Sequence, residues 1–160
     1  RERGIDAAAA SRREQVMKVL IGIDDSPFSR AAIEHVKTMT WPAGTEFHVI
    51  SASAPVFVGP GEAAAPGAIA EIIEQQERFH RGLADKAAAS LKAAGFNVTA
   101  KMVPSDPRGA LVDAAKNLPA DLVVVGSHGR SGLTKLLLGS VATHVVTHAP
   151  CSVLVVKRQA

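Results

Sequence analysis

The 160-residue sequence contains one cysteine, few aromatic residues and no long apolar segment, and each shortage excludes a class of protein. A single cysteine, Cys151, cannot form an internal disulfide and is typical of a reducing compartment. No apolar run approaches the roughly 20 residues that a membrane-spanning helix needs, and no secretory apolar segment stands at the start. We therefore expect a cytoplasmic protein that has no membrane partner.

The charge pattern also argues against a nucleic-acid partner. The net charge is +3, and basic residues gather in residues 1–13 and 157–158, where we interpret them as solvated tails. Aromatic residues form only 4% of the chain, and no zinc-finger spacing occurs. The apolar fraction of 47% is ordinary for a globular protein, so we expect residues 16–158 to form one domain. Residues 1–15 are interpreted as an N-terminal arm that is disordered, trimmed or added.

The most informative stretch runs from residue 121 to residue 141. Its first part, Leu122–Val125, is short, apolar and rich in β-branched residues, which predicts a buried parallel strand. Gly126, Gly129 and Gly132 follow at intervals of three residues. Glycine can adopt a positive φ, and it lets a ligand approach the main chain without interference from a Cβ atom. We therefore expect a ligand-binding loop after this strand.

A helix start follows the glycine loop. Ser140 comes directly after Gly139 and is predicted to cap a helix that extends through His148. The first N–H groups of a helix lack acceptors within the helix and lie at the positive end of its dipole, so they favour an anion. The loop and the helix start could therefore hold one phosphate chain between them.

The rest of the chain alternates between strand and helix patterns. Ser26-Pro27 is a typical helix start, and Pro107 begins another helix that Ser105 or Asp106 could cap. Gly95 is placed to end a long amphipathic helix. Residues 53–67 hold three prolines and three glycines, which predicts a long mobile loop and a candidate lid. The expected strands are 16–23, 45–51, 96–103, 122–125 and 152–156, and the expected helices begin near residues 27, 69, 107 and 140.

This alternation predicts the fold class. Five strands separated by four helices favour an α/β fold, a three-layer, five-stranded parallel doubly wound sheet with helices on both faces. In such sheets ligands bind beyond the carboxyl ends of the strands, at the point where the strand order reverses.

The glycine loop also carries a family resemblance. Gly126, Gly129, Gly139 and Ser140 match the spacing glycine, two residues, glycine, nine residues, glycine, then serine or threonine. With the flanks Val-Val-Gly-Ser-His-Gly-Arg-Ser-Gly and Ala-Pro-Cys-Ser-Val-Leu-Val-Val-Lys, this spacing resembles the ATP-binding subclass of the universal stress protein family. The resemblance covers nearly all of the chain after the arm and implies the strand order 3-2-1-4-5. That order would place Gly126 beside Asp24, which ends the first strand.

The resemblance further implies a site for ATP. In the family, the matching aspartate and the backbone of the second strand lie against adenine, and the glycine loop and the next helix contact ribose and phosphates. Mg²⁺ or Mn²⁺ would be held mainly by the phosphates, because no carboxylate cluster occurs in the sequence. The implied nucleotide-binding residues are Gly22, Ile23, Asp24, Val49, Val125, Gly126, His128, Gly129, Arg130, Gly139, Ser140 and Val141.

Several of these residues have a plainer alternative. Asp24 or Asp25 could cap the helix that follows the first strand instead of contacting a base. The glycines could serve tight loop geometry alone. Arg130 and Lys135 could add positive charge near a triphosphate, or they could simply be solvated.

The sequence shows no evident catalytic machinery. It lacks the P-loop, Gly-x-Gly-x-x-Gly and Gly-x-Ser-x-Gly motifs, and Ser127-His128 form no readable pair of nucleophile and base. His144 and His148 have the spacing of two metal ligands but lack a third, so no metal site is predicted. The leading hypothesis is an ATP-binding regulatory protein of the stress response that signals through nucleotide occupancy. The alternatives are a slow ATP hydrolase or autophosphorylating protein, with Ser140 or a nearby hydroxyl as acceptor, and a structural module with an empty site.

The last predicted strand, Ser152–Val156, points to self-assembly. At a sheet edge its unpaired backbone groups would lie beside apolar side chains, which natural proteins seldom leave uncovered. Antiparallel pairing with a second copy would satisfy these groups through a two-fold axis, and the family resemblance implies the same homodimer. The alternative is that residues 157–160 or the N-terminal arm cover this edge.

Overall fold

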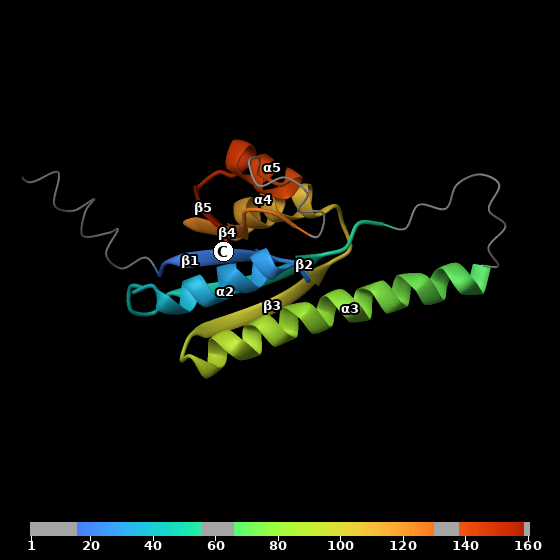
Figure 1. Ribbon diagram of the computed structural model, residues 1–160, viewed down its shortest axis with the longest axis horizontal. Coiled ribbons are helices and arrows are strands. Elements are labelled where there is room, and N and C mark those ends of the chain that lie inside the picture. The colour runs from blue at the N-terminus through green and yellow to red at the C-terminus, as the bar shows by residue number, and fades with distance from the viewer. Residues whose placement is uncertain (1–15, 56–65, 130–137, 159–160) are drawn as a thin grey trace, which may run out of the picture.

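Figure 1 shows the computed structural model, which describes residues 16–55, 66–129 and 138–158. The arm, most of the expected lid segment, Gly132, Arg130 and Lys135 lie outside the described residues. The elements are β1 (Lys18–Ile23), α2 (Pro27–Thr38), β2 (Glu46–Ala52), α3 (Pro66–Ala93), β3 (Asn97–Val103), α4 (Pro107–Asn117), β4 (Leu122–Gly126), α5 (Ser140–His148) and β5 (Ser152–Val156).

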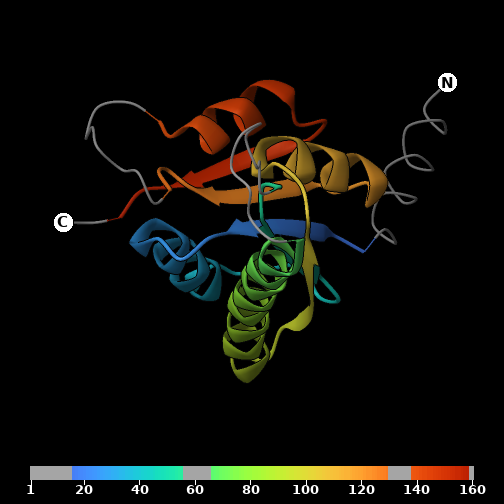
Figure 2. The same ribbon diagram turned by 90° about the vertical axis from the view of Figure 1, so that its right-hand side faces the viewer.

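The five strands form one parallel sheet in the order β3-β2-β1-β4-β5, which confirms the predicted fold class and strand order. β1 lies at the centre, where Val19 pairs with Phe47 of β2 on one side and with Leu122 of β4 on the other. Figure 2 shows the sheet between two helix layers, with α2 and α3 on one face and α4 and α5 on the other. The molecule therefore has the expected three layers.

Side chains along β1 alternate between two apolar cores. Val19 and Ile21 pack with α2 and α3, whereas Leu20 packs with α4 and α5. All three side chains are fully buried. Complete burial of such a side chain stabilises the fold by about 1.5–3 kcal/mol relative to exposure. A strand covered on both faces needs apolar residues at every position, which explains the continuous apolar run in its sequence.

The helix starts at α2 and α4 follow the predicted capping signals. Ser26 Oγ accepts a hydrogen bond from the Ser29 N–H at 3.1 Å, and Pro27 occupies the first turn. Asp106 Oδ1 accepts from the Arg108 N–H at 2.9 Å, again just before a proline. In both helices a side-chain oxygen satisfies an N–H group that has no acceptor within the helix.

The end of α3 is equally well defined. Gly95 has a φ of +91°, a conformation that glycine adopts without a Cβ clash. Its N–H donates to the Lys92 carbonyl at 2.9 Å, and the Phe96 N–H donates to the Leu91 carbonyl at 3.2 Å. These two bonds form a Schellman motif, as expected for a glycine that ends a helix.

The two halves of α3 differ in how much of their surface packs on the sheet. From His80 to Leu91 the helix buries one face against the sheet, whereas its first half extends past the sheet (Figure 1). Ile72, Ile73 and Phe79 in that first half remain 45%, 41% and 48% exposed. The helix begins at Pro66, so the last residues of the expected 53–67 loop are helical.

Among the strands that the structure describes, β5 lies at one edge of the sheet and pairs only with β4. Its residues range from exposed Ser152 to buried Val156, with half-buried positions between them. Just before it, Cys151 is a free, half-buried thiol, and burial raises the pKa of this thiol above its usual value. Within the described ranges, no helix has both the length and the apolar character needed to cross a membrane.

Candidate functional site

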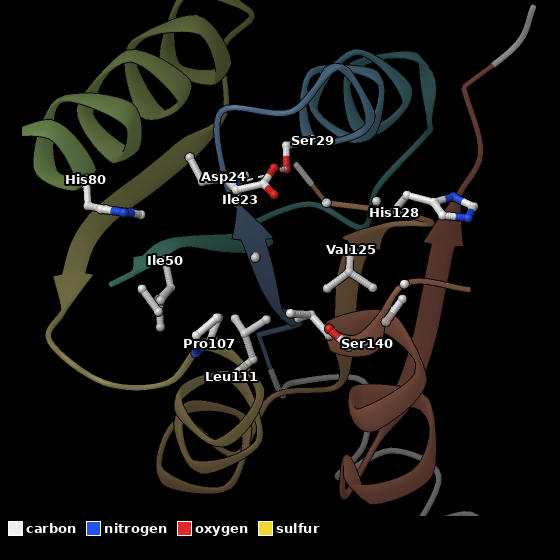
Figure 3. A pocket seen from close by; sticks show the side chains of 17 residues that line it. Ile23, Asp24, Ser29, Ile50, His80, Pro107, Leu111, Val125, His128 and Ser140 are labelled. Atoms are coloured by element: carbon white, nitrogen blue, oxygen red, sulfur yellow. Dashed lines mark hydrogen bonds between the residues drawn. The ribbon is translucent and has the colours of Figure 1, made fainter. Parts of the chain in front are cut away.

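A cavity of about 260 Å³ lies at the carboxyl ends of β1, β2 and β4 (Figure 3). The strand order reverses between β1 and β4, so this is where a doubly wound sheet is expected to bind a ligand. Ten of the twelve predicted site residues line it. They are Gly22, Ile23, Asp24, Val125, Gly126, His128, Gly129, Gly139, Ser140 and Val141.

The other two predicted site residues are Val49 and Arg130. Val49 is 1% exposed and packs in the core between the sheet and helices α2 and α3. Its neighbour Ile50 lines the cavity instead, because successive residues of a strand face opposite sides of the sheet. Arg130 lies outside the described residues.

One end of the cavity is formed by the start of α5. Gly139 is the N-cap of this helix and Ser140 its first residue, so the prediction that Ser140 is the cap was wrong by one position. The Gly139 N–H donates to the Ser127 carbonyl at 2.8 Å, and no side chain caps the helix. The helix itself supplies no acceptor for the N–H groups of Ser140, Val141 and Ala142, and all three residues line the cavity.

The glycines at this end provide space and not an unusual backbone conformation. None of Gly126, Gly129 and Gly139 has a positive φ, contrary to the expectation for the loop. A Cβ at Gly139 would lie 3.1 Å from His128 Cα, and one at Gly126 would lie 2.8 Å from the Phe28 carbonyl carbon. Glycine therefore allows the loop to approach α2 and the start of α5 more closely than any other residue could.

Asp24 has a defined orientation at the end of β1. Its Oδ1 accepts from Ser29 Oγ at 2.6 Å and from the Ser26 N–H at 3.0 Å, while Ser29 Oγ accepts from the Asp24 N–H at 2.9 Å. The other oxygen, Oδ2, is directed at the loop, 2.9 Å from the position of a Cβ at Gly129. Because Ser26 caps α2, neither Asp24 nor Asp25 is the helix cap.

The opposite end of the cavity is mainly apolar and was not predicted. Ile50 and Ala52 come from β2, and Pro107 and Leu111 come from α4. His80 reaches this end from α3, and Figure 3 shows it on the opposite side of the cavity from Ser140. The cavity therefore joins an apolar end to an end that is lined by backbone N–H groups. Two further lining residues, Ser29 and Ala142, also went unpredicted.

His128 and Ser127 are hydrogen-bonded neighbours. The Ser127 Oγ and His128 Nδ1 lie 3.1 Å apart, and the His128 ring lies against Phe28 with ring centroids 5.0 Å apart. Ser127 is only 2% exposed. Ser127 is also absent from the cavity lining, so the pair is not placed as a nucleophile and its base.

Charge in the site is sparse. Among the lining residues that the structure describes, Asp24 is the only carboxylate, and none is a lysine or arginine. Within the same described ranges, no three His, Cys, Asp or Glu residues are grouped to hold a metal ion. His144 and His148 stack on each other with ring centroids 4.1 Å apart. Within the described lining, negative charge on a ligand would be met mainly by N–H groups and the dipole of α5.

Comparison with protein families identifies one match. The family model described as "Universal stress protein family" matches residues 15–157. Universal stress protein MJ0531 of Methanocaldococcus jannaschii is 30% identical over 142 residues, which cover 88% of this chain and 82% of that protein. Mycobacterial universal stress proteins are 34–35% identical, but this chain spans only about half of their length.

Two solved structures share the fold. Protein MJ0577 of M. jannaschii superimposes with a TM-score of 0.77 at 26% identity, covering 89% of this chain and 96% of its own. A universal stress protein solved in complex with cAMP gives a TM-score of 0.62 at 26% identity, covering 89% of this chain and 97% of its own.

Proposed function

The chain belongs to the universal stress protein family, and from this premise we propose that its cavity binds ATP and that the protein signals in a stress response through nucleotide occupancy. One observation carries the proposal, namely that the glycine loop and the first turn of α5 line the same end of one cavity. The complex of a 26% identical family member with cAMP supports an adenine nucleotide as the ligand.

We place the phosphates at the start of α5. The N–H groups of Ser140, Val141 and Ala142 have no acceptor within the helix, and phosphate oxygens would provide acceptors. The helix dipole adds about 0.3–1 kcal/mol for a negative charge near a helix N-terminus. Gly129 and Gly139 line the cavity and carry no side chain, so at these two positions the phosphates would meet only backbone atoms.

We place the base between Asp24 and the apolar end, and the ribose beside the glycine loop. Asp24 Oδ2 is directed at the glycine loop and can accept a hydrogen bond from a hydroxyl or an amine. Ile50 and Leu111 would contact the faces of the base, as apolar side chains do in most small-molecule sites. This orientation places each part of the nucleotide against groups of matching chemistry.

Mg²⁺ or Mn²⁺ would accompany the nucleotide. Mg²⁺ in nucleotide sites is commonly held by phosphate oxygens and one or two carboxylates, with water completing its shell. Asp24 is the one carboxylate among the described lining residues, so the phosphates would hold the ion for the most part. The ion would supply positive charge that the described walls of the cavity do not provide.

Equilibrium binding tests the proposal directly. Calorimetry of the purified chain with ATP, with and without Mg²⁺, should show saturable heat at one site per chain. If the Kd is a hundredth of the ligand concentration, bound ATP should stabilise the fold by about 2.7 kcal/mol, which a thermal shift would report. If millimolar Mg-ATP produces neither heat nor a thermal shift, the proposal is overturned, and the structural module with an empty site remains.

A slow ATP hydrolase or autophosphorylating protein is the second candidate. It is favoured by one observation, that the Ser140 side chain lines the cavity at the first residue of α5. Phosphate release and incorporation of label from ATP would reveal such activity, and Ser140→Ala should abolish the incorporation. Binding without either signal supports regulation through occupancy alone.

We also propose that the protein acts in the cytoplasm as a homodimer that pairs through β5. Within the described part of the chain, the outer side of β5 has no partner strand. Its half-buried apolar residues would be covered by a second copy.

A further inference from the structure

His80 is the one buried histidine among those that the structure describes, with 4% of its surface exposed. It lies on α3, beyond the carboxyl end of β2, and lines the apolar end of the cavity. Its Nδ1 is 2.8 Å from Ser51 Oγ, and Ser51 is completely buried. One turn earlier on α3, Gln76 Oε1 accepts from Ser53 Oγ at 3.3 Å. Two side-chain contacts therefore hold α3 to the end of β2 and fix the position of the imidazole.

Stability alone does not account for this pair. A buried imidazole and hydroxyl must give up water, and their hydrogen bond does little more than offset that loss. Apolar residues of similar shape would serve the core at least as well. Ala84 and Ala88, the next buried residues of the same helix face, are indeed apolar. His80 also lines the cavity, where a ligand can contact it.

The position of His80 relative to the phosphate end indicates which part of a nucleotide it meets. Ser140 and His80 lie on opposite sides of the cavity (Figure 3). A nucleotide whose phosphates sit at the start of α5 extends its base toward α3. The other side chains at that end, Ile50, Pro107 and Leu111, offer no hydrogen bond to the polar edge of a base.

We propose that His80 contacts the base and makes the site prefer purine over pyrimidine nucleotides, and that Ser51 is its positioning residue. The inference rests on the proposed nucleotide site. A purine extends farther from the ribose than a pyrimidine does, so a residue at the far wall contacts the larger base and not the smaller one. An unpaired polar edge in this apolar pocket would be costly, which makes the contact selective.

Affinities for ATP and UTP test this proposal, because the two share their ribose and triphosphate. The wild-type chain should bind ATP at least about tenfold more tightly than UTP. His80→Ala should weaken ATP binding by roughly tenfold and UTP binding by less than about twofold. Ser51→Ala should reduce the preference in the same direction by a smaller factor. His80→Leu keeps most of the buried volume and should show the same changes in ATP and UTP affinity. It replaces the alanine variant if that variant does not fold.

His48→Ala is the matched control. His48 lies on the same strand as Ser51, but its Nδ1 is 2.9 Å from Thr99 Oγ1 and it does not line the cavity. This variant should keep both affinities. Equal affinity of the wild type for ATP and UTP, or an equal change of both in the folded His80 variants, would overturn the inference while leaving the nucleotide site intact. Failure of the wild type to bind either nucleotide would instead refute the proposed function.

Discussion

At Gly129 and Gly139 the cavity wall has no room for a side chain. A Cβ at Gly129 would lie 2.9 Å from Asp24 Oδ2, and one at Gly139 would lie 3.1 Å from His128 Cα. Both distances are shorter than ordinary contacts between non-bonded atoms. The crowded groups border the cavity, so a side chain at either position must displace the ligand or the groups that would hold it.

Replacement of Gly139 by valine should therefore abolish ATP binding. We expect the Kd to rise about 100-fold or more, which corresponds to about 2.7 kcal/mol, when measured by calorimetry. Gly129→Val should act in the same direction, because its side chain would crowd Asp24.

Gly109→Ala on α4 is the control for these substitutions. A Cβ at Gly109 meets nothing within 4 Å, so ATP affinity should not change. Alanine in place of glycine within a helix should stabilise the fold by up to about 1 kcal/mol. A folded Gly139→Val variant that binds ATP normally would contradict the proposed phosphate position.

The sequence identifies one end of the site much better than the other. Gly126, Gly129 and Gly139 lie close together in the chain, so their spacing alone reveals the loop and the helix start. Leu111 and His80 come from two other helices, α4 and α3. Only their tertiary placement brings them to the cavity, and no spacing in the sequence records it.

The start of α4 depends on Asp106 and should respond to pH. Hydrogen bonds from the side chain and backbone of Arg108 lower the pKa of Asp106 from 3.8 to about 2. A carboxylate with a lowered pKa stabilises the fold fully above its unfolded-state pKa, and this contribution is lost as the pH falls through its folded-state pKa. The relevant window is therefore about pH 4 to pH 2.

Asp106→Ala should cost about 1 kcal/mol at pH 7, the usual effect of losing an N-cap. We expect no more than that, because the Asp106 side chain is 44% exposed and its pairing with Arg108 is screened by water. Urea denaturation should show the difference from wild type shrinking as the pH approaches 2. Asp106→Asn keeps a capping oxygen and should lose less stability, and a difference that is constant between pH 7 and pH 2 would rule out this account.

The two halves of α3 should differ in hydrogen exchange. Amides near Ala84 and Leu91 lie in the half that packs on the sheet, whereas those near Ile72 and Ile73 lie in the half that extends beyond it. A helical segment without tertiary contacts and shorter than about 12–15 residues is marginal in water. Amide exchange followed by mass spectrometry or NMR should be much faster in the first half, and uniform protection along α3 would contradict this reading.

Most element boundaries could be predicted because local residue chemistry sets them. Pro107 starts α4 at the predicted residue, and Gly95 ends α3 through its positive φ. The start of α5 was misplaced by one residue because glycine and serine are both good N-caps. The extended backbone of Gly139, with φ −62° and ψ 160°, decides between them and cannot be read from residue type.

At the scale of the whole molecule, β5 should pair with a second copy. Sedimentation at micromolar concentration should show a dimer. Val155→Pro removes a backbone N–H from the edge strand and should shift the equilibrium toward monomer. Ala100→Pro makes the same change in β3, at the opposite edge of the sheet, and should leave the dimer intact. A wild-type chain that sediments as a monomer throughout this range would refute the pairing.

The sequence pattern and the family resemblance contributed differently to the predicted sheet. Alternation of strands and helices is enough to predict parallel strands between two helix layers. It does not determine which strands are neighbours, and the order came from the resemblance. Pairing of β1 with β4 joins residues about a hundred positions apart, and no local signal in the chain specifies it.

That long-range pairing sets the order of events when a ribosome makes this protein. The Lys18 N–H donates to Asp121 Oδ2 across 103 residues of chain, whereas Lys18 already pairs with Glu46 in β2. Until β4 leaves the exit tunnel, β1 lacks its neighbour on one side. We expect the emerging chain to expose unpaired backbone groups and apolar side chains of β1, which chaperones bind. Arrested nascent chains should gain protease resistance around β1 only after β4 has emerged, and resistance at shorter lengths would show that the first half folds independently.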